Sequence, residues 1–304
     1  MGSDFEYLSK SKKNIILDTD IGPDCDDVGA EAVMLYFCRK YGFNVLGMVN
    51  CTSNPYGNGA LDAVGRYCGY GNIPIAQFEK PGFLTDGLKY NKYLSENMSK
   101  RYMNGTLEVL RATDFYSDAL KKADDNSVVV VTIGPLNTFC EILKAEPELV
   151  NRKVYALVSM AGEYAVGKRE YNITCDIASA QYVFANFKNY MIMTGSEVGQ
   201  HILTGFPDMQ KPDITNPIQI AYNLFTGGVN VRSSWDLTAV QFAVEGENGY
   251  YSLSDNGTNV ITDDGRCVFT KHEDGKHNFL VKQKDDRIIA EYLNGILCSF
   301  NKKD

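Results

Sequence analysis

Five aspartates crowd one short stretch near the start of the chain. Residues 16–30 read ILDTDIGPDCDDVGA, with no basic residue among the acidic ones, which are Asp18, Asp20, Asp24, Asp26 and Asp27. Two carboxylates about 4 Å apart repel each other by roughly 4 kcal/mol at an effective dielectric constant near 20. A fold that brings these groups together therefore needs positive charge from elsewhere.

Several known uses of clustered aspartates fit this stretch poorly. Asp26 and Asp27 could favour the dipole of a following helix, but that explains only two of the five. An EF-hand loop counted from Asp18 would place Gly22, Pro23 and Gly29 at positions 5, 6 and 12, which excludes it. A haloacid-dehalogenase-like phosphatase also begins with a strand and D-x-D, but expects Thr or Val where Gly22 stands.

A divalent-cation site explains the cluster better. A strand end and the first turn of the next helix would aim their carboxylates at one ion. Oxygen ligands without a nearby His or Cys pair select Ca²⁺ or Mg²⁺ over zinc. Cys25 lies inside the cluster, but the surrounding negative charge disfavours its thiolate, so we expect it to be a bystander.

The elements that position these residues alternate regularly along the chain. Short β-branched runs are each followed by a longer stretch with helical spacing, which is typical of an α/β fold with an open, mainly parallel, Rossmann-like sheet and helices on both faces. After Trp235 the pattern changes to hairpins with Asn-Gly and Asp-Gly turns and a closing helix at 285–300. Strands are predicted at 14–20, 43–50, 73–78, 128–134, 154–162 and 190–195, and helices at 26–42, 59–71, 136–150 and 176–187. We expect a tail at 1–12 and one domain at 13–304, with loops or extra helices at 80–106 and 205–219.

Ligands of open parallel sheets bind at the carboxyl ends of the strands. The polar residues there are Asp18 and Asp20 after the first strand and residues 50–54 after the second, and glycines follow two later strands at 134 and 162. These positions are where the sequence predicts the site.

The charge balance and the cysteine content limit the kinds of partner and cellular setting that fit this chain. The net charge of −8, from 30 basic and 38 acidic residues, argues against a nucleic-acid partner, which needs a basic face. Eight cysteines are scattered without a C-x-x-C pair, as expected for free thiols in a reducing, cytoplasmic setting. No apolar run has the length of a membrane span, and residues 1–14 lack a signal-type stretch, although a removed export signal stays open.

Five blocks of sequence together resemble one family. The aspartate stretch is similar to the D-T-D-x-G and D-D signature of the inosine–uridine preferring nucleoside hydrolases. In the same order as in that family, VTIGPLNTF (131–139) is similar to its G-P-L-T-N block and EYNITCDIASAQ (170–181) to its E-F-N and D-P-E-A-A blocks. MVNCTSN (48–54) stands where the family has an asparagine after the second strand, and SSWDLTAV (233–240) stands where its H-D-P lies.

The resemblance implies a role for each matching residue. Asp20 would bind Ca²⁺ and act as the general base on its water, and Asp18 would orient the loop. The other metal ligands would be Asp27, the backbone carbonyl of Ile133, and Asp236. Ribose hydroxyls would be held by Asp26, Asn54, Glu170 and Asn172.

Two departures from the family pattern leave points open. The signature here runs G-P-D-C-D-D, two residues longer than G-x-D-D, so Asp24 could enter the metal sphere instead. Trp235 stands where purine-cleaving members have a histidine, and an indole can stack on a base but cannot act as a general acid. The leaving-group acid is therefore unassigned.

The resemblance implies Ca²⁺-dependent hydrolysis of the N-glycosidic bond of a ribonucleoside, giving ribose and a free base, by a homo-oligomer. Two alternatives stay open at this point. One is a hydrolase of another glycoside on the same metal site, and the other is a non-catalytic Ca²⁺-dependent sugar-binding protein.

Overall fold

The molecule is built around one large β-sheet, and the computed structural model describes it and its surroundings over residues 14–85, 90–103 and 109–301. The expected tail, residues 1–12, lies outside the described residues. The strands of the large sheet are β1 (Asn14–Thr19), β2 (Asn44–Asn50), β3 (Ile75–Gln77), β4 (Leu110–Arg111), β5 (Val128–Thr132), β6 (Val154–Met160), β7 (Tyr190–Thr194), β10 (Tyr251–Leu253), β11 (Gly257–Ile261), β12 (Cys267–Lys271) and β13 (His277–Lys282). Their order is β12-β11-β13-β7-β6-β5-β1-β2-β3-β4, with β10 paired to β13.

The central strands are buried on both faces. Ile15 and Leu17 of β1 belong to one apolar core, while Ile16 between them belongs to the other. The valines of β5 alternate between the two cores in the same way, and every residue of β5 and β6 is buried. Continuous runs of valine and isoleucine are typical of parallel strands covered by helices on two sides, which confirms the fold class predicted from the sequence.

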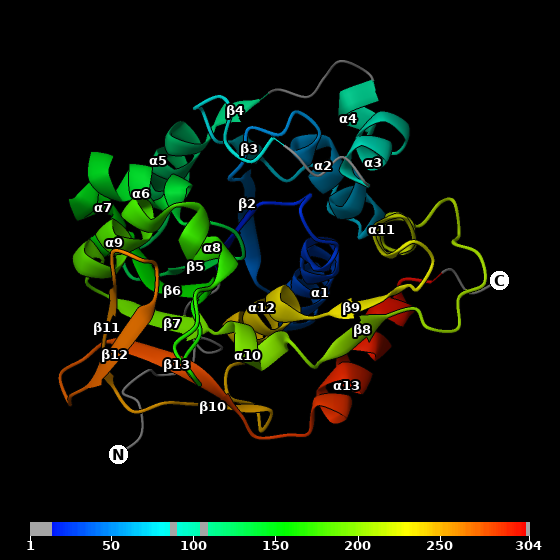
Figure 1. The fold of residues 1–304 in the computed structure, drawn as a ribbon. Helices are drawn as coiled ribbons and strands as arrows, with labels where there is room; N and C mark the ends of the chain where they lie inside the picture. Colours follow the sequence, from blue (N-terminus) through cyan, green and yellow to red (C-terminus); the bar gives the residue numbers. More distant parts are fainter. Residues whose placement is uncertain (1–13, 86–89, 104–108, 302–304) are drawn as a thin grey trace.

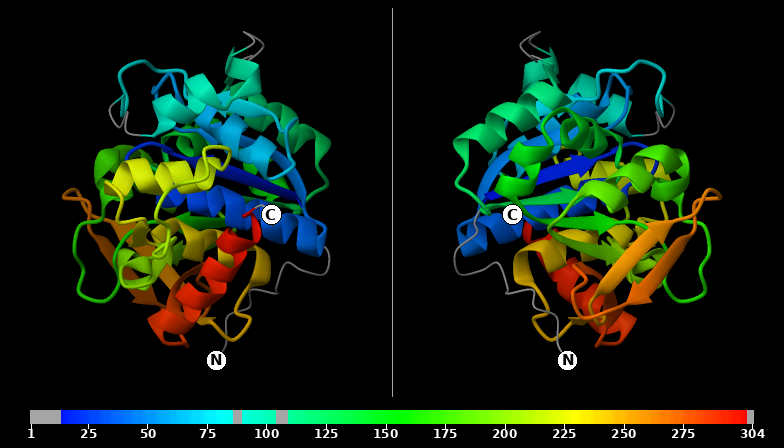
Figure 2. Two further views of the ribbon diagram at one scale, coloured as in Figure 1. Left: turned by 90° about the vertical axis from the view of Figure 1, so that its right-hand side faces the viewer. Right: turned by 90° about the vertical axis from the view of Figure 1, so that its left-hand side faces the viewer.

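Each core is closed by its own set of helices (Figures 1 and 2). One core includes side chains of α1 (Asp26–Tyr41), α2 (Gly57–Tyr67), α11 (Pro217–Thr226), α12 (Trp235–Glu245) and α13 (Asp286–Ser299). The other includes side chains of α5 (Ala112–Lys122), α6 (Asn137–Ala145), α7 (Pro147–Lys153) and α9 (Ile177–Asn186). The shorter helices are α3 (Asn91–Asn97), α4 (Lys100–Met103), α8 (Tyr171–Cys175) and α10 (Ser196–Gly199). None of the described helices is long and apolar enough to cross a membrane.

The C-terminal region extends the sheet rather than standing apart from it. β13 lies parallel beside β7, and β11 and β12 form an antiparallel hairpin through the predicted Asp264-Gly265 turn, where Gly265 has a φ of 82°. The Asn256-Gly257 pair does not join two paired strands, because β10 before it pairs with β13 and Gly257 begins β11. The predicted closing helix is α13.

A small two-stranded sheet, β8 (Leu203–Gly205) with β9 (Val231–Ser233), was not predicted. Its strands are only three residues each, too short to show a period in the sequence. The sheet nevertheless matters, because β9 leads directly into α12 and so places residues 232–236 against the opening turn of α1.

Candidate active site

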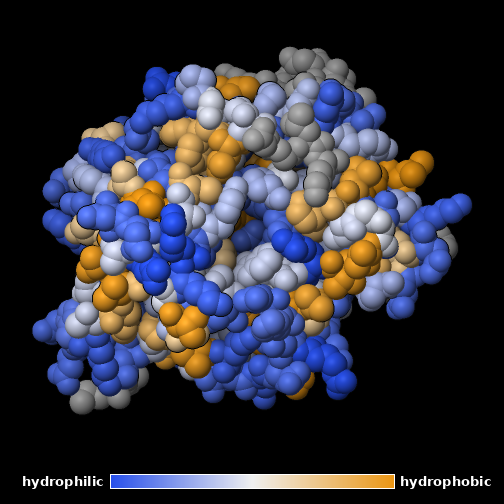
Figure 3. Space-filling view, viewed as in Figure 1, coloured by the Kyte–Doolittle hydropathy of each residue, from blue (hydrophilic) through white to orange (hydrophobic). Residues whose placement is uncertain are grey.

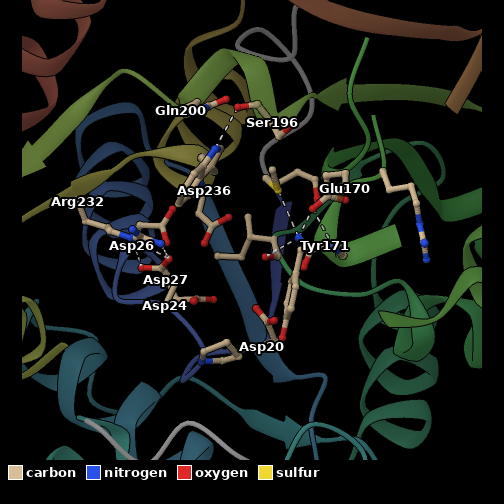
Figure 4. Close-up of a pocket in the computed structure, with 16 residues that line it drawn as sticks. Asp20, Asp24, Asp26, Asp27, Glu170, Tyr171, Ser196, Gln200, Arg232 and Asp236 are labelled. Atoms are coloured by element: carbon tan, nitrogen blue, oxygen red, sulfur yellow. Dashed lines mark hydrogen bonds and ion pairs between the residues drawn. The ribbon is translucent and has the colours of Figure 1, made fainter. Parts of the chain in front are cut away.

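A cavity of about 570 Å³ opens at the carboxyl ends of the parallel strands. Figure 3 shows the hollow near the middle of that face, and Figure 4 shows its lining side chains. Asp20 follows β1 and Ile133 follows β5, as the strand-end argument predicts. The lining residues are Asp20, Pro23, Asp24, Asp26, Asp27, Ile133, Met160, Arg169, Glu170, Tyr171, Asn172, Ser196, Gln200, Arg232, Trp235 and Asp236.

Carboxylates from distant parts of the chain converge in this cavity. Asp26 and Asp27 occupy the first turn of α1, and Asp236 occupies the first turn of α12. One oxygen from each of the three lies within 4.8 Å of the others, close enough to hold a single metal ion. The backbone N–H of Asp236 also donates to Asp26 Oδ2 at 3.2 Å. Two helix N-termini thus help to tolerate the charge that the sequence concentrates here.

Burial makes these charges costly. It raises the pKa of Asp20 to about 7, and the nearby Glu170 and Asp24 charges add to the effect. The pKa values of Asp26, Asp27 and Asp236 are raised well above their usual range, first by burial and then by repulsion between the aspartates. These buried carboxyl groups ionise readily only when a positive charge lies beside them. Because their ligand atoms are hard oxygens, a cation such as Ca²⁺ or Mg²⁺ suits the site.

The grouping differs in one respect from the one the resemblance implied. Asp26, expected on the sugar, belongs to the three-oxygen cluster, whereas Asp20, expected on the metal, lines the same cavity outside that cluster. Asp27 is also held by the Thr19 hydroxyl, which donates to its Oδ1. The structure therefore brings together Asp20, Asp26, Asp27 and Asp236 and adds Asp26 to the possible metal ligands.

Asp24 has a partner of its own. Arg232 of β9 donates from Nε to both carboxylate oxygens of Asp24, at 3.0 and 2.9 Å, and from Nη2 to one of them. The guanidinium also lies over the ring of Trp235, 5.0 Å from its centroid. The loop at residues 22–27, two residues longer than the family pattern, thus places an ion pair in the cavity lining. Asp24 is paired with an arginine and is not part of the carboxylate cluster.

Trp235 is fixed at the start of α12. Its ring nitrogen donates to the backbone carbonyl of Ser196 at 3.0 Å, and its ring lines the cavity. Cys25, by contrast, is fully buried next to the cluster, and burial raises the pKa of its thiol. This agrees with the expectation that the cysteine is not a nucleophile.

Glu170 and Asn172 connect the strand ends to α8. The Glu170 carboxylate caps this helix by accepting from the backbone N–H groups of Asn172 (2.7 Å), Ile173 (3.0 Å) and Gly162 (3.1 Å). The Asn172 side-chain amide donates to the carbonyls of Met160 (3.0 Å) and Ile133 (3.3 Å). Both residues line the cavity, but much of their hydrogen bonding holds the wall together.

Asn54 does not line the cavity. Its side chain is buried, its Oδ1 accepts from the backbone N–H of Tyr56 at 2.9 Å, and its Nδ2 donates to the carbonyl of Thr85 at 3.4 Å. The structure therefore gives the expected sugar ligand Asn54 a local role in shaping the loop after β2.

Asp18 points away from the cavity. Its Oδ2 accepts from the hydroxyls of Tyr116 (2.6 Å) and Thr138 (2.5 Å), which belong to α5 and α6. These bonds tie the end of β1 to the neighbouring helices.

Several lining residues were not predicted from the sequence. Arg232 is the most consequential, and its only signal was a basic residue three positions before Trp235. The others are Pro23, Met160, Arg169, Tyr171, Ser196 and Gln200.

An open, mainly parallel sheet with an acidic cavity at its strand ends is typical of α/β proteins that bind small ligands. The family model of the inosine-uridine preferring nucleoside hydrolases matches residues 15–269, and the chain belongs to this family of glycosyl hydrolases.

Solved structures share the fold at low sequence identity. An inosine-guanosine nucleoside hydrolase superposes with a TM-score of 0.71 at 17% identity, covering 94% of this chain and 98% of its own. A plant nucleoside hydrolase gives 0.70 at 15%, covering 95% and 98%. The inosine-uridine preferring nucleoside hydrolase of Bacillus anthracis gives 0.69 at 15%, covering 93% and 98%. No curated protein matches the chain in sequence.

The close packing of α10 against α12 yields a stability prediction. A Cβ on Gly199 would meet the Trp235 backbone and lie 2.6 Å from the Ser234 carbonyl oxygen. We expect Gly199→Ala to lower the free energy of unfolding by about 1–3 kcal/mol and to displace Trp235. Urea unfolding and the fluorescence of this single tryptophan measure both effects.

Gly295→Ala is the matched control. Gly295 lies inside α13, and apart from its own stretch of helix no described atom lies within 4 Å of an added Cβ, so the change should be neutral or stabilise by up to about 1 kcal/mol. Equal effects of the two substitutions would show that α10 does not constrain Trp235.

Proposed function

We propose that the protein hydrolyses the N-glycosidic bond of a ribonucleoside with the help of a bound Ca²⁺ ion. The observation that carries the proposal is the convergence of buried carboxylates from residues 20–27 and 236 on one cavity, in a member of this family. The cavity volume of about 570 Å³ suits a small ligand such as a nucleoside.

The residues that would hold the ion are all carboxylates or carbonyls. We assign Asp26, Asp27 and Asp236 from their mutual distances, and Asp20 and the Ile133 carbonyl from the family resemblance. When bound, Ca²⁺ would offset the buried negative charge and lower the pKa of a water ligand. The donor set contains no thiolate or imidazole, which fits a hard cation.

Asp20 is proposed as the general base. It lies at the end of β1, buried except toward the cavity, and its carboxylate would take the proton from the attacking water. The bond to the base breaks through a sugar with oxocarbenium character, and the surrounding carboxylates favour that positive charge.

The sugar would be held from the opposite wall. The Nδ2 of Asn172 is already committed to two carbonyls, so its Oδ1 is the atom that would accept a ribose hydroxyl. Glu170 would hold this wall in place, and because it lines the cavity it would also contact the sugar.

Release of ribose from inosine and uridine tests the proposal directly. We expect turnover of at least one nucleoside in the presence of calcium and its loss after chelation, followed with a reducing-sugar assay. Hydrolysis confined to aryl glycosides would instead favour the alternative glycosidase. Ribose binding by calorimetry without turnover of any glycoside would favour the sugar-binding alternative.

A further inference from the structure

One wall of the cavity carries a positive charge that the proposed hydrolysis does not yet use. The Arg232 guanidinium lies over two aromatic rings, 5.0 Å from the centroid of Trp235 and 5.5 Å from that of Phe225. Figure 4 shows it beside Asp24 and Asp26 at the edge of the acidic cluster. Its side chain is 37% exposed and lines the cavity.

Asp24 fixes one edge of this guanidinium and leaves another edge available. The bonds to Asp24 use Nε and Nη2, while Nη1 makes no hydrogen bond within the part of the chain that the structure describes. The guanidinium also lies over the Trp235 ring, whose face attracts a cation. A planar donor held in this way loses little conformational entropy when it binds a ligand.

The neighbouring side chains extend this polar and aromatic wall. Ser196 and Gln200 also line it, and neither side chain makes a hydrogen bond to another described residue. The aromatic ring of Trp235 lines the same cavity. An aromatic face next to free donors matches a planar heterocycle that carries acceptor atoms.

We propose that Arg232 binds the leaving group: its Nη1 donates to an acceptor atom of the base and stabilises the negative charge that the base gains as the glycosidic bond breaks. The inference rests on the proposed function and names the leaving group that the site accepts. That group is a planar base with a carbonyl or ring-nitrogen acceptor.

The reaction balances without an acidic side chain on this wall. Water adds its hydroxyl group to the anomeric carbon, and the electron pair of the C–N bond goes to the base nitrogen. The proton taken from water by Asp20 is matched by one that the base nitrogen receives from solvent, so the products are ribose and the neutral base. Arg232 stays protonated throughout, because a guanidinium does not release its proton in proteins.

Two substrates separate leaving-group stabilisation from the rest of catalysis. In inosine the base is a poor leaving group that needs help, whereas the p-nitrophenolate of p-nitrophenyl β-ribofuranoside is a stable anion. We expect Arg232→Gln to lower kcat for inosine by about 100-fold, as for loss of one donor to a developing anion, and to change kcat for the aryl riboside only a few-fold.

A double variant controls for the charge left on Asp24. Arg232→Gln alone leaves that carboxylate unpaired beside the cluster, but Asp24→Asn/Arg232→Gln removes both charges together. The same split between substrates is expected in the double variant. Arg266→Gln, which breaks an exposed pair with Asp264 at 2.9 Å, should leave both rates unchanged.

The outcomes are distinct. Equal losses on both substrates in the single and double variants, or an unchanged rate on inosine, would overturn the role of Arg232. If the unaltered protein cleaves neither inosine nor uridine, the proposed function itself is overturned, and this inference with it.

Discussion

Asp20→Asn is expected to lower kcat for nucleoside hydrolysis by about 10²–10⁴-fold while the protein stays folded. The substitution keeps the size of the side chain and removes the oxygen that would accept a proton from water. Asp20 lines the cavity directly after β1, so the change acts where the attacking water would lie. Steady-state kinetics on inosine and uridine measure the loss.

Asp176→Asn is the matched control for this experiment. Asp176 does not line the site cavity, and its carboxylate caps α9 by accepting from the backbone N–H of Ser179 at 3.0 Å. Asparagine caps a helix about as well as aspartate, so activity and stability should be retained. If Asp20→Asn keeps activity within a few-fold of the unaltered protein, another group removes the proton and the assignment of the base is wrong.

The sheet could be predicted from the sequence because its strands are buried on both sides. The four successive valines of β5 favour a strand, because β-branched side chains fit the pleated surface of a sheet. The helices α1, α2, α6 and α9 follow from their apolar spacing, whereas α5, α11 and α12 were not predicted. The strands β4, β8 and β9 were missed because two or three residues carry no periodic signal.

The site could be predicted only in part. A sequence shows which polar residues follow a strand, but not which of their side chains point into the cavity. Asp20 lines the cavity, whereas the Asn54 carboxamide accepts from the backbone N–H of Tyr56. The sequence likewise does not show which residues far apart in the chain form ion pairs. Asp24 and Arg232 are 208 positions apart, and only the path of β9 brings them together.

Calcium and protons are expected to compete for stabilisation of the folded state. Burial raises the pKa of Asp18, Asp20 and Glu170 to about 7, from ordinary values of 3.8, 3.8 and 4.5. Between about pH 4 and 7 the folded protein thus binds more protons than the unfolded chain. Without calcium, its free energy of unfolding should therefore be largest at the acid end of this window and fall as the pH rises to 7.

Bound calcium should raise the free energy of unfolding at neutral pH, because the ion then neutralises the carboxylates that protons neutralise in acid. At a free concentration 100 times its Kd, calcium would stabilise the folded state by about 2.7 kcal/mol, and by much less at pH 5, where protons occupy the same carboxylates. Urea unfolding at pH 5 and 7.5, with calcium or with a chelator, gives the four values needed. Chelation at pH 7.5 should also abolish turnover.

Asp236→Asn separates the metal site from the other buried acids. Asp236 is the member of the cluster that comes from α12, so its loss should weaken calcium affinity by calorimetry and remove most of the calcium-dependent stabilisation at pH 7.5. Asp18→Asn should instead leave calcium affinity intact and reduce only the pH dependence, because Asp18 faces Tyr116 and Thr138. Unchanged calcium affinity in Asp236→Asn would mean that the two ends of the chain do not share an ion. The buried carboxylates would then have to be neutralised by protons and by basic side chains of the cavity such as Arg232.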